Sequence, residues 1–321
     1  MEVKVWVKGK SRTELVEDFI YNQSFSYSVI YNGLVEVNKN EIIIHTDDDN
    51  LARLNPNFKL KKKCDQTIKW KTKVKEALVI HSSYKNIYYH WIYDILPQLK
   101  TLETNSNLNI IMSPVEYSFQ IESLKLFCDT NNVFSESSFY EVDKLYLPSQ
   151  TTRFLMPFNF VFEFLNNKLS YIKKNKTRNK IYIRRSNKYK RSILNEEKLI
   201  YILLSKGYLI YNLEDISFSK QVEIFSSANL IVSAHGSGLT NIVFCEPETS
   251  ILEIYGPGCG ERCFARISNY LNLNYSALEI SKKSYRSPFH HLFYMLFPSL
   301  NRFDFKINIE EFNLNFKNYL A

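Results

Sequence analysis

Short apolar runs alternate with longer amphipathic segments through the second half of the chain, and this alternation constrains the fold more than any other feature. The runs are rich in β-branched and aromatic residues and have the length of buried strands. They lie at 180–184, 208–211, 230–233, 251–255 and 275–278, and helices are expected between them near 195–205, 217–227, 239–244 and 262–271. This order predicts a parallel, doubly wound α/β sheet that binds ligands beyond the carboxyl ends of its strands.

The first half of the chain repeats the alternation less regularly. Strands are predicted at 77–80, 109–112 and 143–147, a helix at 119–128, and a hairpin at 33–46 that turns at Asn38-Lys39-Asn40. Because 321 residues exceed one ordinary core, we expect two Rossmann-like domains, 1–150 and 151–321, with the connection near Pro148. The basic run 59–63 is expected to be a solvated loop.

Composition narrows the classes of function. The formal charge of +8 suits an anionic ligand, an anionic membrane surface or a nucleic acid, but no arginine-rich tract or nucleic-acid-binding motif favours the third. The five cysteines are odd in number and fit reduced thiols better than a disulfide framework. The N-terminus lacks a signal-peptide core, and no apolar run approaches the roughly 20 residues of a spanning helix. We therefore expect a soluble cytoplasmic protein with no nucleic-acid partner.

A glycine turn follows the predicted strand 230–233. It consists of Ser233, Ala234, His235, Gly236, Ser237, Gly238, Leu239, Thr240 and Asn241. A strand precedes it and a helix begins in it, which is the context that an anion-binding turn requires. The glycines let the backbone approach a bulky anion, and the first helical amides would face that anion. The turn therefore predicts a site for the diphosphate of an activated sugar, with the histidine either donating to the ligand or capping local backbone.

Charged residues are expected at the same edge of the sheet. Arg184 and Arg185 leave the first predicted strand and Arg191 follows in a basic loop. Guanidinium groups suit paired phosphate oxygens, and a solvated basic loop is the alternative interpretation. Glu253 lies inside an apolar strand, where an unpaired carboxylate is costly. Its predicted partner is either a ribose diol or an arginine.

The segment Tyr89-His90-Trp91-Ile92-Tyr93-Asp94-Ile95-Leu96-Pro97-Gln98-Leu99 is predicted to be helical in the N-terminal half. In a helix, His90 and Asp94 share a face because they are four residues apart. Pro97 removes the amide that would bond the Tyr93 carbonyl, so a distorted turn is expected at Asp94. The pair is either a packed histidine beside an aspartate that satisfies backbone amides, or a catalytic carboxylate tuned by a histidine.

Taken together, these motifs resemble the family 61 glycosyltransferases. The resemblance rests on the Tyr-His-Trp-x-x-Asp-x-Leu-Pro-x-Leu segment, Arg184-Arg185 with Arg191-Ser192-Ile193-Leu194-Asn195-Glu196, the turn His235 to Asn241, and Glu253-Ile254. It covers roughly 77–278 and leaves out the first 75 residues and the last 40. The chain departs from the pattern at Gln98, where an arginine is frequent, and this departure bears on acceptor contacts.

The resemblance implies a GT-B arrangement, two Rossmann-like domains that face a cleft, with inversion at the anomeric carbon and no metal or other cofactor. The N-terminal domain would bind the acceptor, and Asp94 would deprotonate its hydroxyl while His90 orients that carboxylate or is itself the base. The C-terminal domain would bind a nucleotide-sugar. The implied donor-binding residues are Arg184, Arg185, Arg191, Asn195, His235, Gly236, Ser237, Gly238, Leu239, Thr240, Asn241 and Glu253.

The residues themselves agree that no metal ligand set is evident. No Asp-x-Asp follows a predicted strand of the sheet in the position needed to hold a divalent ion, and Asp47-Asp48-Asp49 is expected to be an exposed loop. The charge of the leaving diphosphate would then be stabilised by the arginines, the helix N-terminus and His235.

The expected function is transfer of a sugar to a hydroxyl of a glycan or lipid-linked glycan in bacterial surface polysaccharide synthesis. Peripheral contact with the inner face of the membrane is one further option. A non-catalytic nucleotide-sugar or glycan-binding protein of a polysaccharide assembly complex is the alternative. The C-terminal segment, about 286–321, is expected to pack back on the first domain, and docking to a membrane or a partner is the other interpretation.

Overall fold

The computed structural model describes residues 2–7, 10–15, 24–46, 58–62, 71–173, 177, 179–185, 192–256, 262–280 and 304–316. The chain forms two compact units: Ile20–Tyr171, the N-terminal unit, and Met1–Phe19 with Ile172–Ala321, the C-terminal unit. The boundary expected after residue 150 therefore falls after residue 171, and the first 19 residues join the C-terminal unit. Strand pairing is the physical reason, because β1 (Glu2–Val7) runs parallel to β16 (Asn274–Glu279).

The C-terminal unit is built on one seven-stranded sheet in the order β13-β12-β14-β15-β16-β1-β2. The strands not yet given are β12 (Asn179–Arg184), β13 (Tyr208–Asn212), β14 (Ala228–Ala234), β15 (Ser250–Tyr255) and β2 (Lys10–Leu15). Every neighbouring pair is parallel except β1 with β2, so the predicted strands and their parallel pairing are confirmed. The winding direction reverses between β12 and β14, which is where such a sheet binds ligands.

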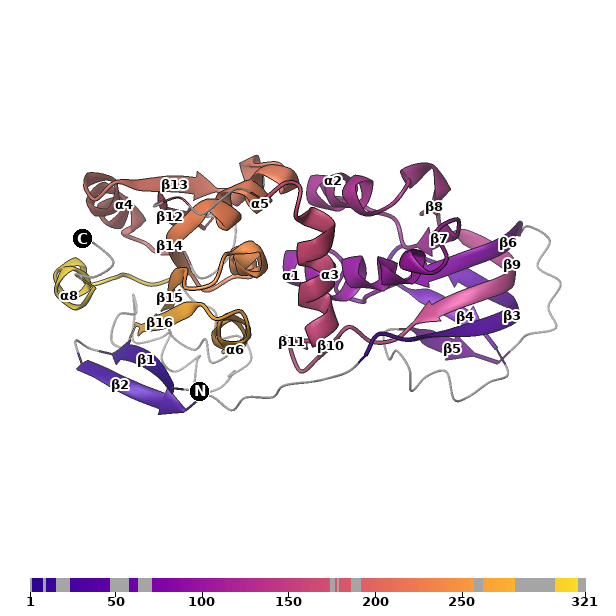
Figure 1. Cartoon of the computed structure of the whole chain (residues 1–321), viewed down its shortest axis with the longest axis horizontal. Coiled ribbons are helices and arrows are strands. Elements are labelled where there is room, and N and C mark those ends of the chain that lie inside the picture. Colours follow the sequence, from indigo (N-terminus) through magenta and orange to yellow (C-terminus); the bar gives the residue numbers. More distant parts are fainter. Residues whose placement is uncertain are drawn as a thin grey trace. The chain divides into compact units, whose positions relative to one another are not determined.

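Helices cover both faces of this sheet (Figure 1). One face carries α4 (Glu196–Ser205) and α8 (Ile309–Asn315), and the other carries α5 (Phe218–Ser227), η6 (Ser237–Phe244) and α6 (Cys263–Tyr270). Helix α4 is followed by Gly207, whose φ of +80° suits a residue without Cβ. The helix expected at 239–244 is η6, a 3-10 helix rather than an α-helix. The other helices predicted for this half are confirmed.

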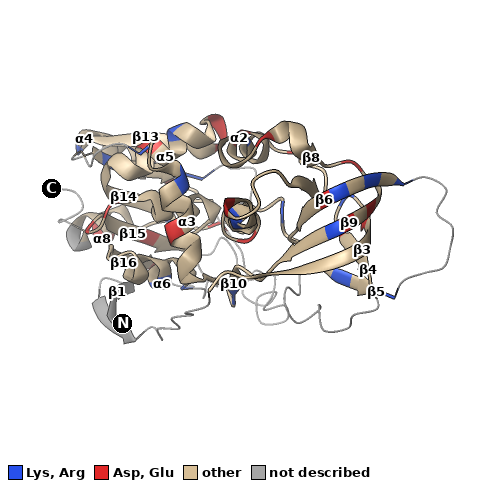
Figure 2. Cartoon of the chain, turned by 45° about the vertical axis from the view of Figure 1, so that its right-hand side comes forward, with Lys and Arg blue, Asp and Glu red and all other residues tan. Residues whose placement is uncertain are grey.

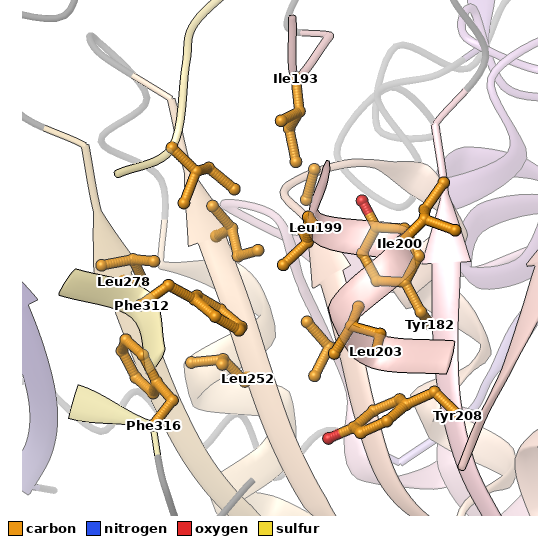
Figure 3. Close-up of a cluster of buried hydrophobic side chains, with 14 of the residues drawn as sticks. Tyr182, Ile193, Leu199, Ile200, Leu203, Tyr208, Leu252, Leu278, Phe312 and Phe316 are labelled. Atoms are coloured by element: carbon orange, nitrogen blue, oxygen red, sulfur yellow. The ribbon is translucent and has the colours of Figure 1, made fainter. Parts of the chain in front are cut away.

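The core on the α4 face joins residues far apart in the sequence. Figure 3 shows Leu199 and Leu203 of α4 beside Tyr182 of β12, with Phe312 and Phe316 at the α8 end of the same cluster. All five side chains are buried. Since fully burying a large apolar side chain contributes about 1.5–3 kcal/mol, α8 is held by a substantial part of this core.

The C-terminal segment is thus attached to the C-terminal unit. Phe305 donates its amide to the Ser192 carbonyl at 3.0 Å and accepts from the Leu194 amide at 2.7 Å. Phe305 and Ile307 are buried in the same cluster as α8. For 304–316, the expectation that this segment packs on the first domain is therefore wrong, and the remainder of 286–321 lies outside the described residues.

The N-terminal unit has a mixed seven-stranded sheet in the order β5-β4-β3-β9-β6-β7-β8. The strands are β3 (Tyr27–Val37), β4 (Ile42–His45), β5 (Lys59–Lys61), β6 (Thr72–Ile80), β7 (Asn109–Met112), β8 (Val133–Phe134) and β9 (Ser138–Pro148). The predicted hairpin is confirmed, and its tight turn makes β3 antiparallel to β4; β3 is also antiparallel to β9. The unit is therefore α/β as expected, and its sheet is mixed, with parallel pairing at β6, β7 and β9 and antiparallel pairing at β3. The run at Lys59 is strand β5 rather than a loop.

Helical segments connect the parallel strands of this unit. A continuous stretch of α1 (Tyr88–His90), a π-helical turn (Trp91–Ile95) and a 3-10 helix (Leu96–Glu103) leads from β6 to β7. Helix α2 (Ser118–Phe127) follows β7, and α3 (Asn159–Leu169) follows a small hairpin of β10 (Thr152–Arg153) and β11 (Met156–Pro157). The predicted distortion at Asp94 is confirmed, because Pro97 stands where the helical pattern changes.

Positive charge is visible along β5 and β6 of the N-terminal unit (Figure 2). Much of it is locally offset: Lys59 pairs with Glu41, and Lys71 lies 3.3 Å from Glu141.

Through the described ranges, no helix is long and apolar enough to cross a membrane. Cys128, Cys245 and Cys263 are free thiols, as expected, and burial raises the pKa of the Cys128 thiol to about 11.

Candidate active site

The carboxyl edge between β12 and β14 gathers several of the predicted donor-binding residues. Arg185 follows the last residue of β12, and His235 follows the last residue of β14. Arg185 donates from Nη1 to the His235 carbonyl at 3.0 Å. Because adjacent parallel strands end at the same edge, the sequence correctly predicted that these two residues meet.

Gly236 is required by this contact rather than by its backbone angles. Its φ of 170° is extended and open to any residue. A Cβ built at this position would lie 2.1 Å from Arg185 Nη1, so any other residue would displace this guanidinium. The glycine therefore makes room for a protein guanidinium, whereas the sequence predicted that it makes room for the ligand. Gly238 has a similar packing role, since its Cβ would lie 3.2 Å from Leu213 and 3.3 Å from Ile183.

Arg184 points to the other side of β12, toward α4. It donates from Nε to Glu196 at 3.1 Å and from Nη2 to Glu197. Glu196 also accepts from the Tyr182 hydroxyl at 2.8 Å, and burial with this nearby carboxylate raises the pKa of that phenol well above its ordinary value. The strand alternation places residues 182 and 184 on one face. Arg184 thus anchors α4, and the direct donor contact expected of it is not what the structure provides.

His235 and Glu253 form a close pair beneath the glycine turn. The His235 Nδ1 lies 2.5 Å from Glu253 Oε1, and the imidazole stacks on Tyr255 with ring centroids 5.0 Å apart. The other carboxylate oxygen accepts from the hydroxyls of Tyr255, at 2.9 Å, and Tyr275. Burial, with the neighbouring carboxylate, raises the pKa of both phenols well above 10.0, so they remain neutral donors.

This network corrects the role expected of Glu253. Its side chain is fully buried, and both oxygens are engaged by protein donors. Because the carboxylate is buried, a ribose diol has no access to it. Among the described residues, no observed hydrogen bond joins Glu253 to an arginine. Tyr255 could have been inferred from the sequence, because it lies two residues along the same strand and so on the same face. Tyr275 could not, since only the β15–β16 register brings it near.

The later residues of the turn are structural. Leu239, Thr240 and Asn241 are fully buried in η6. Asn241 donates to Gln221 of α5 at 3.0 Å and to the Gly238 carbonyl at 3.2 Å. They support the turn from behind, and the donor contacts expected of them stay a prediction. His235, Ser237 and Gly238 stay partly exposed.

Asn195 lies at the start of α4 and bonds to the C-terminal segment. Asn195 pairs with the backbone of Ile307, donating to its carbonyl at 2.8 Å and accepting from its amide at 2.9 Å. It therefore fixes the C-terminal segment, and the donor contact expected of it stays a prediction. Arg191 lies outside the described residues.

In the N-terminal unit, His90 and Asp94 meet as the helical spacing predicted. The His90 Nδ1 lies 2.7 Å from Asp94 Oδ2. The imidazole is also held by the rings of Tyr84 and Tyr89, whose centroids lie 5.0 and 5.3 Å from its own. The carboxylate is 7% exposed and the imidazole 18%. The pair is therefore a hydrogen-bonded unit whose histidine is the more accessible member.

Both oxygens of Asp94 accept further hydrogen bonds. Thr152 of β10 donates to Oδ1 at 2.7 Å, and Ser82, which follows β6, donates to Oδ2 at 3.2 Å. These donors come from chain segments that leave β9 and β6, two parallel strands that end at the same edge. Neither residue belongs to a recognisable sequence motif, although a polar residue after each parallel strand was a usable signal.

Gln98, the position at which the sequence departs from the family pattern, is completely buried. It donates from Nε2 to the His81 carbonyl at 2.9 Å and to the Asp94 carbonyl at 2.5 Å, while Oε1 accepts from the His81 amide at 3.1 Å. The amide thus ties the distorted helix to the end of β6. Burial of His81 itself lowers the pKa of its imidazole to about 4, so this histidine is neutral at physiological pH.

Across the described ranges, no group of three or more His, Cys, Asp or Glu side chains is arranged to hold a metal ion. The polar groups at the carboxyl ends of the strands in each unit can donate hydrogen bonds, supply one guanidinium charge and move a proton through an imidazole.

Comparison with known proteins gives short matches of moderate identity. The chain is 32% identical over 65 residues to "Beta-1,2-xylosyltransferase RCN11" of Oryza sativa subsp. japonica, covering 20% of this chain and 12% of that protein. It is 35% identical over 69 residues to "Beta-1,2-xylosyltransferase" of Arabidopsis thaliana, covering 22% and 13%. It is 26% identical over 135 residues to "EGF domain-specific O-linked N-acetylglucosamine transferase" of Bos taurus, covering 40% and 25%.

The chain thus aligns with a quarter or less of these relatives' lengths. A broader match comes from the family profile described as Glycosyltransferase 61, which covers residues 88–252, a little over half of the 321. That interval begins just before His90 and ends just before Glu253, so it spans the His90–Asp94 pair, Arg185 and the glycine turn. The chain belongs to glycosyltransferase family 61.

Proposed function

We propose that this protein is an inverting glycosyltransferase that moves a sugar from a nucleotide-sugar to a hydroxyl of a glycan. The observation that carries the proposal is the His90–Asp94 pair, in a chain of a glycosyltransferase family. Such a pair can remove a proton from a hydroxyl, and proton removal by a positioned side chain accelerates reactions by about 10²–10⁴-fold.

His90 is assigned as the base and Asp94 as the residue that orients it. Asp94 accepts from Thr152 on one oxygen and from Ser82 and His90 on the other, and it is nearly buried. A carboxylate in this setting has little room for an incoming hydroxyl. With Nδ1–H donating to Asp94, the second nitrogen of His90 carries a lone pair, and no described residue donates a hydrogen bond to it.

The reaction is then a single in-line displacement. The acceptor hydroxyl gives its proton to His90 Nε2 while its oxygen forms a bond to the anomeric carbon of the donor. The bond from that carbon to the diphosphate oxygen breaks, and the nucleoside diphosphate leaves with the electron pair. Asp94 stabilises the imidazolium that forms, as a buried carboxylate does beside a histidine base.

The donor is assigned to the edge between β12 and β14 of the C-terminal unit. Arg185 lies there at the point where the winding reverses, and the partly exposed turn at Ser237 lies beside it. A guanidinium suits the oxygens of a diphosphate and would offset the charge of the leaving group without a divalent ion. The proposal includes a GT-B arrangement, in which both units serve one reaction. The polysaccharide pathway and the cellular compartment stay predictions.

The two neighbouring arginines provide the test of the donor site. Arg185→Ala is expected to weaken binding of nucleoside diphosphates by roughly 10–100-fold, the value of a lost charge-assisted hydrogen bond. Arg184→Ala removes the same charge from a side chain that faces Glu196 and Glu197, and we expect affinity to stay near that of the parent protein. Titration calorimetry with a panel of nucleoside diphosphates measures both, and equal losses would remove the assignment.

The alternative, a binding protein without catalysis, differs in one simple assay. An enzyme is expected to release nucleoside diphosphate slowly from its donor when water replaces the acceptor. If calorimetry identifies a bound nucleotide-sugar and that compound is neither hydrolysed nor transferred, the binding protein is the better description.

A further inference from the structure

Tyr84 is an exposed aromatic residue beside the candidate base. Its side chain belongs to a residue that is 59% exposed, and its ring centroid lies 5.0 Å from that of His90 with the planes tilted by 32°. Single exposed aromatic rings are common on protein surfaces, but this ring offers an apolar face directly beside the group proposed to act on the substrate.

The position of Tyr84 is fixed by the same hydrogen bonds that fix the base. The Tyr84 amide donates to the Ser82 hydroxyl at 3.3 Å, and that hydroxyl donates to Asp94 at 3.2 Å. The Tyr84 carbonyl accepts from the Ile87 amide at 2.9 Å, which closes a tight turn. The ring is thus held by a rigid loop at the carboxyl end of β6 and does not sit on a loose tip.

Few chemical classes suit this position. A neutral ligand with both apolar and polar groups matches these surroundings, because the ring offers an apolar face and His90 and the Ser82–Asp94 hydrogen bonds lie beside it. A pyranose has an apolar face of C–H groups that packs on an aromatic ring and a rim of hydroxyls that can reach an imidazole. The phenol and the imidazole are neighbours, with ring centroids 5.0 Å apart, so one sugar ring can contact both.

We propose that Tyr84 is the stacking platform of an acceptor subsite, where the face of a pyranose packs on the phenol and one of its hydroxyls reaches His90. This inference rests on the proposed function and assigns the residue that positions its acceptor sugar. Tyr84 is a substrate-positioning residue and takes no part in proton transfer.

Three variants separate stacking from hydrogen bonding. Tyr84→Ala removes the ring, whereas Tyr84→Phe and Tyr84→Trp keep an aromatic face. Tyr31→Ala is the matched control, because Tyr31 is 70% exposed on β3 of the same unit. Binding is measured by saturation-transfer NMR with methyl glycosides of glucose, galactose, xylose and N-acetylglucosamine, alongside a threonine-containing peptide. Circular dichroism checks that each variant is folded.

We expect at least one methyl glycoside to bind the parent protein with saturation concentrated on one ring face. Tyr84→Ala should weaken that binding by about tenfold, near the upper end of the value of an aromatic contact, while the aromatic variants and Tyr31→Ala retain it. Absence of glycoside binding, equal binding in Tyr84→Ala, or preference for the peptide would each overturn the inference.

The inference and the proposed function can fail separately. Glycoside binding needs no donor, so it stands even if no nucleotide-sugar is bound or turned over. Where transfer is measured, Tyr84→Ala should raise the KM for the acceptor and leave both nucleotide affinity and the pH dependence of kcat unchanged. A shifted pH profile would show instead that Tyr84 acts by orienting His90.

Discussion

Each unit of this protein contains a close histidine–carboxylate pair, and the two pairs differ in sequence separation, in burial and in the groups that donate to the carboxylate. His90 and Asp94 are 2.7 Å apart on one distorted helical segment, four residues from each other. His235 and Glu253 are 2.5 Å apart and belong to the ends of two neighbouring strands. The first carboxylate accepts from the hydroxyls of Ser82 and Thr152, and the second from two phenols.

These surroundings give the pairs different capacities. Glu253 is completely buried, and a buried carboxylate is costly unless its hydrogen-bond partners are kept. Asp94 is bonded by short, rotatable hydroxyl groups, and its histidine is 18% exposed. The first pair can take up and release a proton near a substrate, whereas the second is suited to hold the glycine turn in one shape.

The largest effect is expected from His90. His90→Ala should lower the rate of transfer by about 10²–10⁴-fold, because the base is removed, while affinity for nucleotide stays unchanged. His45→Ala is the matched control, since His45 also pairs with a carboxylate of the N-terminal unit, Glu36 at 3.2 Å. Initial rates with a saturating donor measure the loss.

His235→Ala completes that comparison. It should weaken nucleotide binding in calorimetry, since the turn beside Arg185 loses its support. The distinction between the pairs fails if His90→Ala weakens nucleotide binding or if His235→Ala lowers the rate alone.

A smaller effect, on stability, is expected from the carboxylates. Glu253→Gln can keep an oxygen toward the two phenols, but its amide nitrogen then faces His235 Nδ1 in a buried site, so the free energy of unfolding should fall by about 2–3 kcal/mol. Asp94→Asn should cost about 1 kcal/mol, because Ser82 and Thr152 can rotate their hydroxyls to accept. Urea denaturation followed by circular dichroism gives both values. Equal losses would mean that burial does not separate the pairs.

The sequence predicted the His90–Asp94 contact but not the His235–Glu253 contact, because only the first joins residues that are close in the sequence. The His90–Asp94 contact follows from helical periodicity alone. The five parallel strands and the meeting of Arg185 with the glycine turn follow from strand periodicity and the geometry of doubly wound sheets. In each case a short-range pattern fixes the outcome.

Such short-range patterns do not predict contacts that depend on sheet register or on distant segments of the chain. Glu253 meets Tyr275 because β15 and β16 are paired in one register, and Asn195 meets Ile307 across 112 residues. Arg184 and Arg185 are adjacent and chemically identical, yet only their opposite directions from β12 decide which pairs with α4. The first 19 residues belong to the C-terminal unit through pairing with the last strand, which no local signal announces.

The smallest effect concerns the hairpin that brings Thr152 to Asp94. Its two-residue turn, Phe154-Leu155, has φ of 48° and 55°, and such turns favour Asn-Gly because residues with a Cβ are strained there. Phe154 is 74% exposed, so it loses little burial on replacement. Phe154→Asn should therefore stabilise the protein by about 1 kcal/mol, whereas Phe154→Ala, which also removes the ring, keeps the strain.

Urea denaturation of these two variants, with transfer rates measured beside it, tests whether the turn only supports Asp94. Thr152 donates to Asp94 from the strand and not from the turn, so relief of strain should leave its 2.7 Å hydrogen bond intact. A stabilised Phe154→Asn with an unchanged rate is the expected result. A stabilised but slower variant would show that the strained turn takes part in setting the position of the His90–Asp94 pair, a dependence that the buried His235–Glu253 pair has no means to share.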